Sequence, residues 1–195
     1  MEFLTPLAGE TILDAGCGTG IFTFDFLAHG ANVIGLDLSF PMIDKASRKC
    51  RSLSLPFSPV VGDMTALPFR DESFDKAVSI TALEFIEDGI GAVDELFRVT
   101  RSGGIVVVAT LNRLSPWATR RKEEAGKKKT IFSKAIFRSP GEMLALAAVP
   151  GIVKTAAHFQ KDFDPETAIK AEREGRQKDL QTGAFVAVRW HKPVD

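Results

Sequence analysis

Short apolar runs alternate along the chain with longer segments whose apolar residues recur at helical spacing. Apolar runs of this length, bounded by glycine or polar residues, are typical of strands that are covered on both faces. The predicted strands are 11–15, 31–36, 57–62, 74–80 and 105–111. The predicted helices between them are 21–29, 41–53 and 91–100. Strands that alternate with helices in this way predict an α/β fold built around a parallel sheet.

The last third of the chain shows weaker patterns. Ser139 and Pro140 have the cap and first-turn chemistry of a helix start, and the apolar residues after them extend that helix to Val149. Two final strands are predicted at 152–163 and 183–191, with a charged helix at 165–177 between them.

The first predicted strand runs directly into three glycines, Gly16, Gly18 and Gly20. Glycine adopts positive φ and lets a ligand approach the backbone, so glycines at alternate positions between a strand and a helix indicate a ligand lying against main chain. A dinucleotide fingerprint would place its third glycine at position 21, where this chain has Ile21. That spacing argues against a nicotinamide cofactor. The alternative is a tight turn that binds no ligand.

Residues around these glycines, and four later segments in the same order, carry a family resemblance. The segments are ILDAGCGTG at 12–20, VIGLDLS at 33–39, VGDMTALPF at 61–69, SFD at 73–75, and RV with GG at 98–104. Together they resemble the motifs of the class I S-adenosylmethionine-dependent methyltransferases, over about residues 10–111. The resemblance implies a Rossmann-like, doubly wound, seven-stranded and mostly parallel sheet with helices on both faces and an antiparallel edge hairpin. We expect one domain over 1–195, with a lid-like insertion at 112–138.

The same resemblance implies S-adenosylmethionine as the cofactor. The residues that would hold it are Asp14, Gly16, Gly18, Gly20, Asp37, Asp63 and Met64. The first four would hold the aminocarboxypropyl end, Asp37 the ribose diol, and Asp63 with the main-chain amide of Met64 the adenine. A carboxylate suits a diol because it accepts two hydrogen bonds at once. The structural alternatives are that Asp37 or Ser39 caps the next helix, and that Asp63 caps a short helix after it.

The segment after the fourth strand, Thr81 to Phe85, should face the methyl end of the cofactor, which makes Thr81 and Glu84 candidates to line the acceptor pocket. Leu83 and Phe85 are expected in the core or against the adenine. Many relatives have a histidine in this segment and this chain has none, so the sequence offers no convincing general base.

The expected function is in-line methyl transfer to a small-molecule, lipid or quinone, or carrier-bound acceptor. The alternative is a cofactor-binding regulatory or interaction module without catalysis, which the missing histidine and the absence of the helices that the family usually carries upstream favour.

Charge is balanced, with 25 Lys and Arg against 25 Asp and Glu, so composition gives no reason to expect a nucleic-acid partner. The stretch 120–138 is locally basic. Its positive residues are Arg120, Arg121, Lys122, Lys127, Lys128, Lys129, Lys134 and Arg138. A basic lid could steer an anionic acceptor, and the alternative is a solvated or partly disordered helix.

No apolar run reaches the ~18 residues of a membrane span, and the start Met1-Glu2-Phe3 lacks the basic region of a signal peptide. Cys17 and Cys50 match no zinc or redox spacing, so no metal is expected and both thiols should be reduced. These features predict a cytoplasmic protein.

Overall fold

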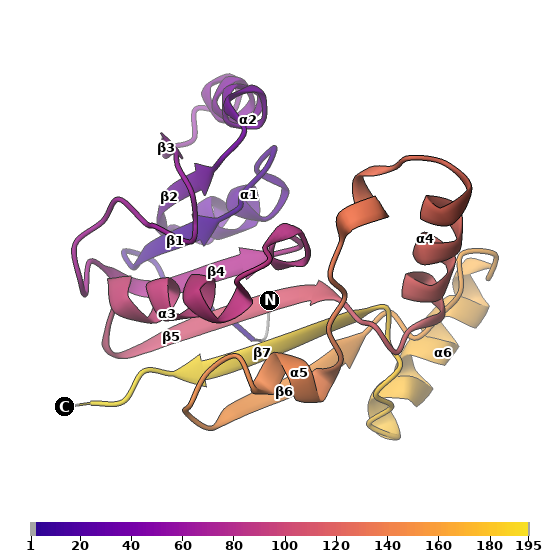
Figure 1. The fold of residues 1–195 in the computed structure, drawn as a ribbon. Coiled ribbons are helices and arrows are strands. Elements are labelled where there is room, and N and C mark those ends of the chain that lie inside the picture. Colours follow the sequence, from indigo (N-terminus) through magenta and orange to yellow (C-terminus); the bar gives the residue numbers. More distant parts are fainter. Residues whose placement is uncertain (1–2, 195) are drawn as a thin grey trace.

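The computed structural model describes residues 3–194, and within them seven strands form one sheet in the order β3-β2-β1-β4-β5-β7-β6 (Figure 1). The strands are β1 (Thr11–Ala15), β2 (Asn32–Asp37), β3 (Phe57–Val61), β4 (Phe74–Ile80), β5 (Thr100–Leu111), β6 (Gly151–Ala156) and β7 (Phe185–His191). The chain begins at β1, moves outward to β3 and returns to β4 on the other side of β1. Strand order therefore reverses between β1 and β4, where α/β sheets bind ligands.

The pairings confirm the predicted mostly parallel sheet with an antiparallel edge. β1 pairs in parallel with β2 and β4, as do β2 with β3 and β4 with β5, whereas β7 pairs antiparallel with both β5 and β6. The reversed strand β7 thus lies inside the sheet, and β6 is at its edge. The predicted strand 152–163 was too long, because β6 ends at Ala156 and the chain then turns away toward α6.

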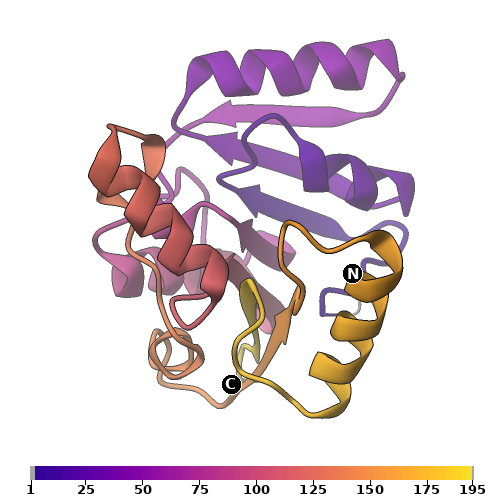
Figure 2. The same cartoon turned by 90° about the vertical axis from the view of Figure 1, so that its right-hand side faces the viewer.

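Helices cover both faces of the sheet. They are α1 (Ile21–Ala28), α2 (Phe40–Ser52), α3 (Gly89–Val99), α4 (Pro116–Lys127), α5 (Pro140–Leu144) and α6 (Pro165–Gln177), with single-turn 3-10 helices η1 (Leu83–Phe85) and η2 (Ile131–Lys134). α3 and α5 lie on one face, and α1, α2 and α6 on the other (Figures 1 and 2). α4 stands beyond the carboxyl end of β5 (Figure 1). Within 3–194, no helix is both long and apolar enough to cross a membrane.

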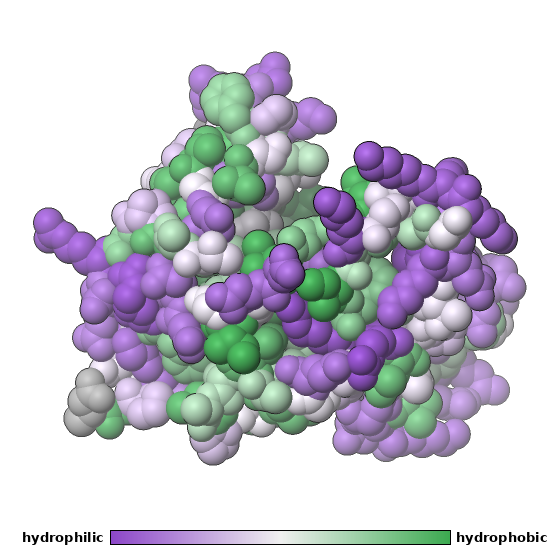
Figure 3. All heavy atoms as spheres, in the orientation of Figure 1, coloured by the Kyte–Doolittle hydropathy of each residue, from purple (hydrophilic) through white to green (hydrophobic). Residues whose placement is uncertain are grey.

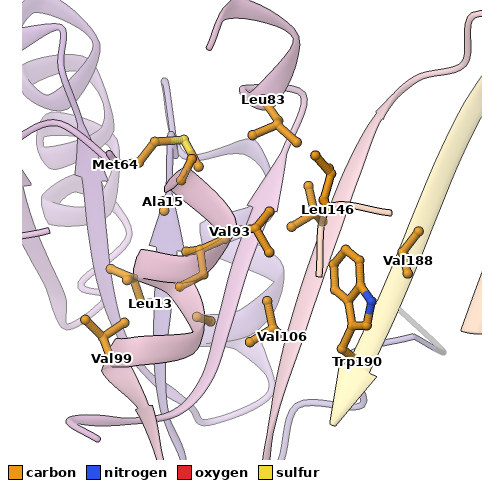
Figure 4. Packing of buried hydrophobic residues seen from close by; sticks show 14 of the residues in the cluster. Leu13, Ala15, Met64, Leu83, Val93, Val99, Val106, Leu146, Val188 and Trp190 are labelled. Carbon is orange, nitrogen blue, oxygen red and sulfur yellow. The ribbon is translucent and has the colours of Figure 1, made fainter. Parts of the chain in front are cut away.

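The core explains why β1 is apolar on both faces. Leu13 packs in the cluster beneath α3 and α5, while its neighbour Ile12 packs in the cluster on the opposite face, with Phe26 of α1. Figure 4 shows the first cluster continuing through Val106 of β5 to Trp190 of β7, which is fully buried. Side chains of this kind each contribute ~1.5–3 kcal/mol when they are buried. β1 is thereby fixed from both sides, and the glycine turn that follows it has a rigid base.

Candidate functional site

The glycine turn after β1 is bonded to the end of β2. The amides of Gly16 and Cys17 donate to the carbonyl of Leu36 over 2.7 and 3.0 Å, and the amide of Gly18 donates to Oδ2 of Asp37 over 2.8 Å. Gly16, Gly18 and Gly20 have φ of 77°, 55° and 82°, in the left-handed region that glycine adopts without strain. The turn is therefore a defined structure that ends where α1 begins.

The three glycines have different surroundings. A Cβ at Gly16 would lie 2.2 Å from Cβ of Ala82, and one at Gly20 would lie 3.1 Å from the ring of Phe24. At both positions the lack of a side chain lets neighbouring parts of the protein pack closely. A Cβ at Gly18 would meet no described atom within 4 Å. Gly18 thus faces open space, as expected for a glycine that admits a ligand to the backbone.

That space is a cavity of about 840 Å³ at the carboxyl ends of β1, β2, β3 and β4. Its volume is within the range of small-molecule and cofactor sites. In Figure 3 the surface is hollowed between the part of the molecule that carries α2 and the part that carries α4. The predicted site residues on its wall are Gly16, Gly18, Asp37, Asp63, Met64 and Thr81. Asp14 and Gly20 are not on the wall, and Glu84 lines a neighbouring cavity.

Asp37 is at the end of β2 with both carboxylate oxygens bonded to backbone. Oδ2 accepts from Gly18 and Oδ1 from the amide of Ser39, each over 2.8 Å. Each oxygen has a second lone pair, so a diol in the cavity can still donate to the carboxylate. Ser39 is the residue before α2, but its side chain makes no cap hydrogen bond. Asp37 therefore shapes the glycine turn and remains able to bind a ligand.

Asp63 follows β3 and is exposed on the cavity wall. Its Oδ1 accepts from the amide and the hydroxyl of Thr65, both over 2.8 Å. The residues after it form a turn and not the short helix considered above, so Asp63 closes an Asx-turn. The adjoining Met64 is buried with its side chain in the core.

Asp14 lies behind the cavity wall, with 2% of its surface exposed. Its Oδ2 accepts a 2.6 Å hydrogen bond from the hydroxyl of Thr23, which is fully buried in α1. Burial raises the pKa of Asp14 to about 6, the bond from Thr23 opposes that rise, and the charge of Asp37 adds to it. The bond ties α1 to β1 beneath the glycine turn. Direct contact of Asp14 with a cofactor stays a prediction.

A second cavity of about 460 Å³ adjoins the first, and Thr81, Phe85 and Ile131 line both. Thr81 has φ of 56°, which is rare for a β-branched residue and strained. Such strain is concentrated at functional positions. Because Thr81 lines both cavities, this strained residue lies where the two cavities meet.

Five aromatic side chains line the second cavity and were not predicted as a group. They are Phe85, Trp117, Phe132, Phe159 and Phe185. Trp117 and Phe132 come from the 112–138 insertion, and the indole Nε1 of Trp117 donates to the carbonyl of Phe159 over 2.8 Å. The only sequence signal was composition, with 15 phenylalanines and no tyrosine. Without phenol hydroxyls, these side chains make the wall of the cavity mostly apolar.

Glu84 is a buried carboxyl among the residues that line this cavity. It is 1% exposed, and among residues 3–194 its Oε2 has no hydrogen-bond partner. Burial raises the pKa of the Glu84 carboxyl, while the Thr110 hydroxyl and the charge of Arg138 act in the opposite direction. The neighbouring Leu83 is fully buried, as expected. Phe85 is 47% exposed and lines both cavities, so it does not belong to the core, and its contact with the adenine stays a prediction.

The basic residues of 120–138 do not all lie on one charged surface, as the prediction assumed. Arg138 is 8% exposed and donates to the carbonyls of Leu83 and Ile86 over 3.0 and 3.2 Å, so it supports η1 and does not belong to a charged surface. Figure 3 shows hydrophilic side chains over α4 and the segment after it, where Lys127 to Lys129 are exposed. The insertion is an ordered helix and turn with a basic outer surface.

A doubly wound sheet with a glycine turn, an acidic residue after its second strand and a cavity at the reversal of strand order defines a Rossmann-like nucleotide-binding protein. A family model described as "Methyltransferase domain" matches residues 13–108. Residues 13–108 therefore carry a methyltransferase domain, and the fold around them is the one expected for the class I S-adenosylmethionine-dependent methyltransferases.

Two curated relatives and one solved structure illustrate the similarity. The demethylmenaquinone methyltransferase of Beutenbergia cavernae is 36% identical over 118 residues, 60% of this chain and 47% of that protein. The malonyl-[acyl-carrier protein] O-methyltransferase of Erwinia billingiae is 40% identical over 111 residues, 57% of this chain and 43% of that protein. The chain thus spans less than half the length of either relative. The geranyl diphosphate C-methyltransferase of Streptomyces coelicolor A3(2) has the same fold, with a TM-score of 0.70 at 21% identity over 100% of this chain and 76% of that one.

Proposed function

We propose that this chain binds S-adenosylmethionine in the larger cavity and transfers its methyl group to an acceptor in the smaller one. The observation that carries the proposal is the meeting of the two cavities at Thr81. A cavity at the strand ends with Gly18, Asp37 and Asp63 on its wall suits a nucleoside, and the aromatic-lined cavity beside it suits an acceptor. An inactive binding module would need only the first cavity.

The residues on the wall fit the proposed cofactor. Gly18 leaves the backbone open, which suits the aminocarboxypropyl chain, and Asp37 has lone pairs free for the ribose diol. Asp63 can accept from the adenine amino group, beside the backbone of Met64. S-adenosylmethionine supplies an electrophilic methyl on a sulfonium, so the protein has no need to activate the donor.

What the protein contributes is orientation and exclusion of water. Holding two reactants in line can lower a barrier by ~7–11 kcal/mol. Here the rigid ends of β1 and β4 hold one reactant, and the aromatic walls around Trp117 and Phe132 enclose the other. Residues 112–138 would then act as the lid of the acceptor cavity.

For the acceptor we propose a broad chemical class, whereas for the cofactor we propose a single compound. Relatives are named for a carrier-bound malonyl group and for demethylmenaquinone, so a small-molecule, quinone or lipid, or carrier-bound acceptor is proposed for this chain. The exposed lysines from Lys127 to Lys129 would attract an acceptor that carries negative charge at a distance from its reacting atom.

The test is calorimetric titration with S-adenosylmethionine, S-adenosylhomocysteine and NAD, on the wild type and on Asp37→Asn. We expect binding of both adenosyl compounds and none of NAD. Asp37→Asn should weaken that binding by about 1.5–3 kcal/mol, the range for a hydrogen bond to a charged group. The matched control is Asp25→Asn, at an exposed position of α1. Equal affinity of both variants, or binding of NAD alone, would refute the assignment.

A further inference from the structure

Glu84 carries an inference about the acceptor that rests on the proposed function. Glu84 lines the smaller cavity, and a carboxyl group that is 99% removed from solvent with an unpartnered oxygen is costly unless a ligand completes its hydrogen bonds. We infer that Glu84 is the proton acceptor for the methyl acceptor, whose reacting end is an uncharged hydrophobic group with an enol or phenol hydroxyl.

The first argument is that Glu84 is held in place. It lies in η1, and the carbonyls of Leu83 in η1 and of Ile86 just after it accept from the guanidinium of Arg138. The carbonyl of Glu84 itself accepts from the amide of Ile136 over 2.7 Å. The segment that covers the cavity is thus bonded to the turn that holds the carboxyl. Precise placement of this kind is what a group that receives a proton requires.

The second argument is the chemistry of the cavity around Glu84. Its walls are aromatic and aliphatic, and Thr81 and Arg121 are the other polar residues that line it. Arg121 is already paired with Glu124 over 3.2 Å and lies over the ring of Phe132. A carboxylate acceptor would bring a second negative charge next to Glu84, and the guanidinium of Arg138, which faces Glu84, already donates to the carbonyls of Leu83 and Ile86. A neutral ring with a hydroxyl group supplies the donor that Oε2 lacks.

The step balances without any further reactant. The acceptor hydroxyl gives its proton to the Glu84 carboxylate, and its oxygen, or the ring carbon that shares its electrons, forms a bond to the methyl carbon. The bond from that carbon to the donor sulfur breaks, and its electron pair stays on sulfur, which becomes a neutral thioether. Glu84 then returns the proton to water.

The groups that face Glu84 set its ionisation. They are the Thr110 hydroxyl on β5 and the Arg138 guanidinium, both of which favour the carboxylate, together with Arg121 of α4 across the cavity. Glu142 of α5 acts on Arg138. Burial is the largest influence and it raises the pKa of Glu84. Affinity for a hydroxyl donor should therefore increase with pH as Glu84 ionises.

The experiment uses 2-naphthol, its methyl ether 2-methoxynaphthalene, and 2-naphthoate as probes, with the full chain saturated with S-adenosylhomocysteine. Binding is followed by tryptophan fluorescence, because Trp117 lines the cavity. We expect the wild type to prefer 2-naphthol to the ether by about tenfold or more, as for a hydrogen bond to a charged group. We also expect 2-naphthoate to bind most weakly.

Glu84→Gln keeps the shape and an accepting oxygen but takes no proton. It should reduce the preference to a few-fold and remove its pH dependence, while Glu123→Gln on the exposed side of α4 should change neither. A wild type that binds the phenol and its ether equally, or that prefers 2-naphthoate, would overturn the inference without any variant. Absence of S-adenosylhomocysteine binding would instead refute the proposed function.

Discussion

Gly16 and Gly18 share a left-handed backbone but are required for different reasons. At Gly16 an added Cβ would collide with Ala82, and at Gly18 it would enter the cavity. One glycine therefore supports the packing of the protein and the other supports the ligand. Sequence motifs treat the two positions alike, whereas the structure separates them.

This separation can be measured by comparing Gly18→Ala with Gly16→Ala. Both variants carry the cost of alanine in the left-handed region, ~1–2 kcal/mol. Gly16→Ala should lose a further 1–3 kcal/mol or so in urea unfolding, because its Cβ overpacks against Ala82. Gly18→Ala should lose no more than the shared cost, yet lose tenfold or more in affinity for S-adenosylhomocysteine. Equal stability and equal affinity of the two variants would contradict these roles.

Asp14 gives a pH-dependent prediction. Its pKa is raised from 3.8 to about 6 in the folded protein, so ionising Asp14 costs more free energy in the folded state than in the unfolded state. The cost is absent below the unfolded pKa, grows as pH rises through this window, and is complete above about pH 6. For a fully buried group this amounts to roughly 3 kcal/mol.

The comparison uses unfolding free energies of the wild type and Asp14→Asn from about pH 4 to pH 7. Asparagine can still accept from Thr23 but does not ionise, so the variant should gain stability relative to the wild type as pH rises. The matched control is Asp25→Asn, at an exposed position of α1. A constant difference between wild type and Asp14→Asn would show that Asp14 is not perturbed by burial.

At the scale of elements, η1 depends on a residue far from it in sequence. Arg138 donates to two carbonyls of the η1 turn, and a Cβ at Gly89 would lie 2.6 Å from its guanidinium. α3 therefore begins at a glycine so that this side chain can pass. The turn, the start of α3 and the covering segment form one unit around the acceptor cavity.

Arg138→Met should destabilise the protein by about 1–3 kcal/mol or more, because it leaves buried carbonyls without donors. Lys134→Met, in the same segment but exposed, should stay within about 0.5 kcal/mol of the wild type. Urea unfolding gives both values. If the two variants are equally stable, Arg138 is a surface cation, as first predicted from the charge pattern.

The basic stretch can be tested through Lys127, Lys128 and Lys129. None of the three lines either cavity, so their replacement by glutamine should leave affinity for S-adenosylhomocysteine unchanged. We expect it to raise the KM for an anionic acceptor, with the effect disappearing at high salt. A loss of cofactor affinity would mean that these lysines act on the first cavity.

At the scale of the molecule, predictions from sequence succeeded where local pattern and local structure coincide. The strands β1 and β4 were predicted correctly because each is buried on both faces. The turn after β1 was predicted correctly because its backbone conformation needs glycine. In the smaller cavity the sequence pointed to Thr81 and Glu84 but not to the aromatic walls. Those walls come from Phe85, Trp117, Phe132, Phe159 and Phe185, which are distant in sequence and share no period. The prediction for Arg138 was wrong for the same reason, because the burial of a charged side chain depends on partners that only the fold brings near.

The most direct test of the account is a crystal structure with S-adenosylhomocysteine bound. The account predicts the adenine beside Asp63 and Met64, the ribose hydroxyls on Asp37, and the sulfur at Thr81, facing the aromatic cavity. A ligand bound elsewhere, or one whose sulfur is turned away from Thr81, would contradict methyl transfer between these two cavities.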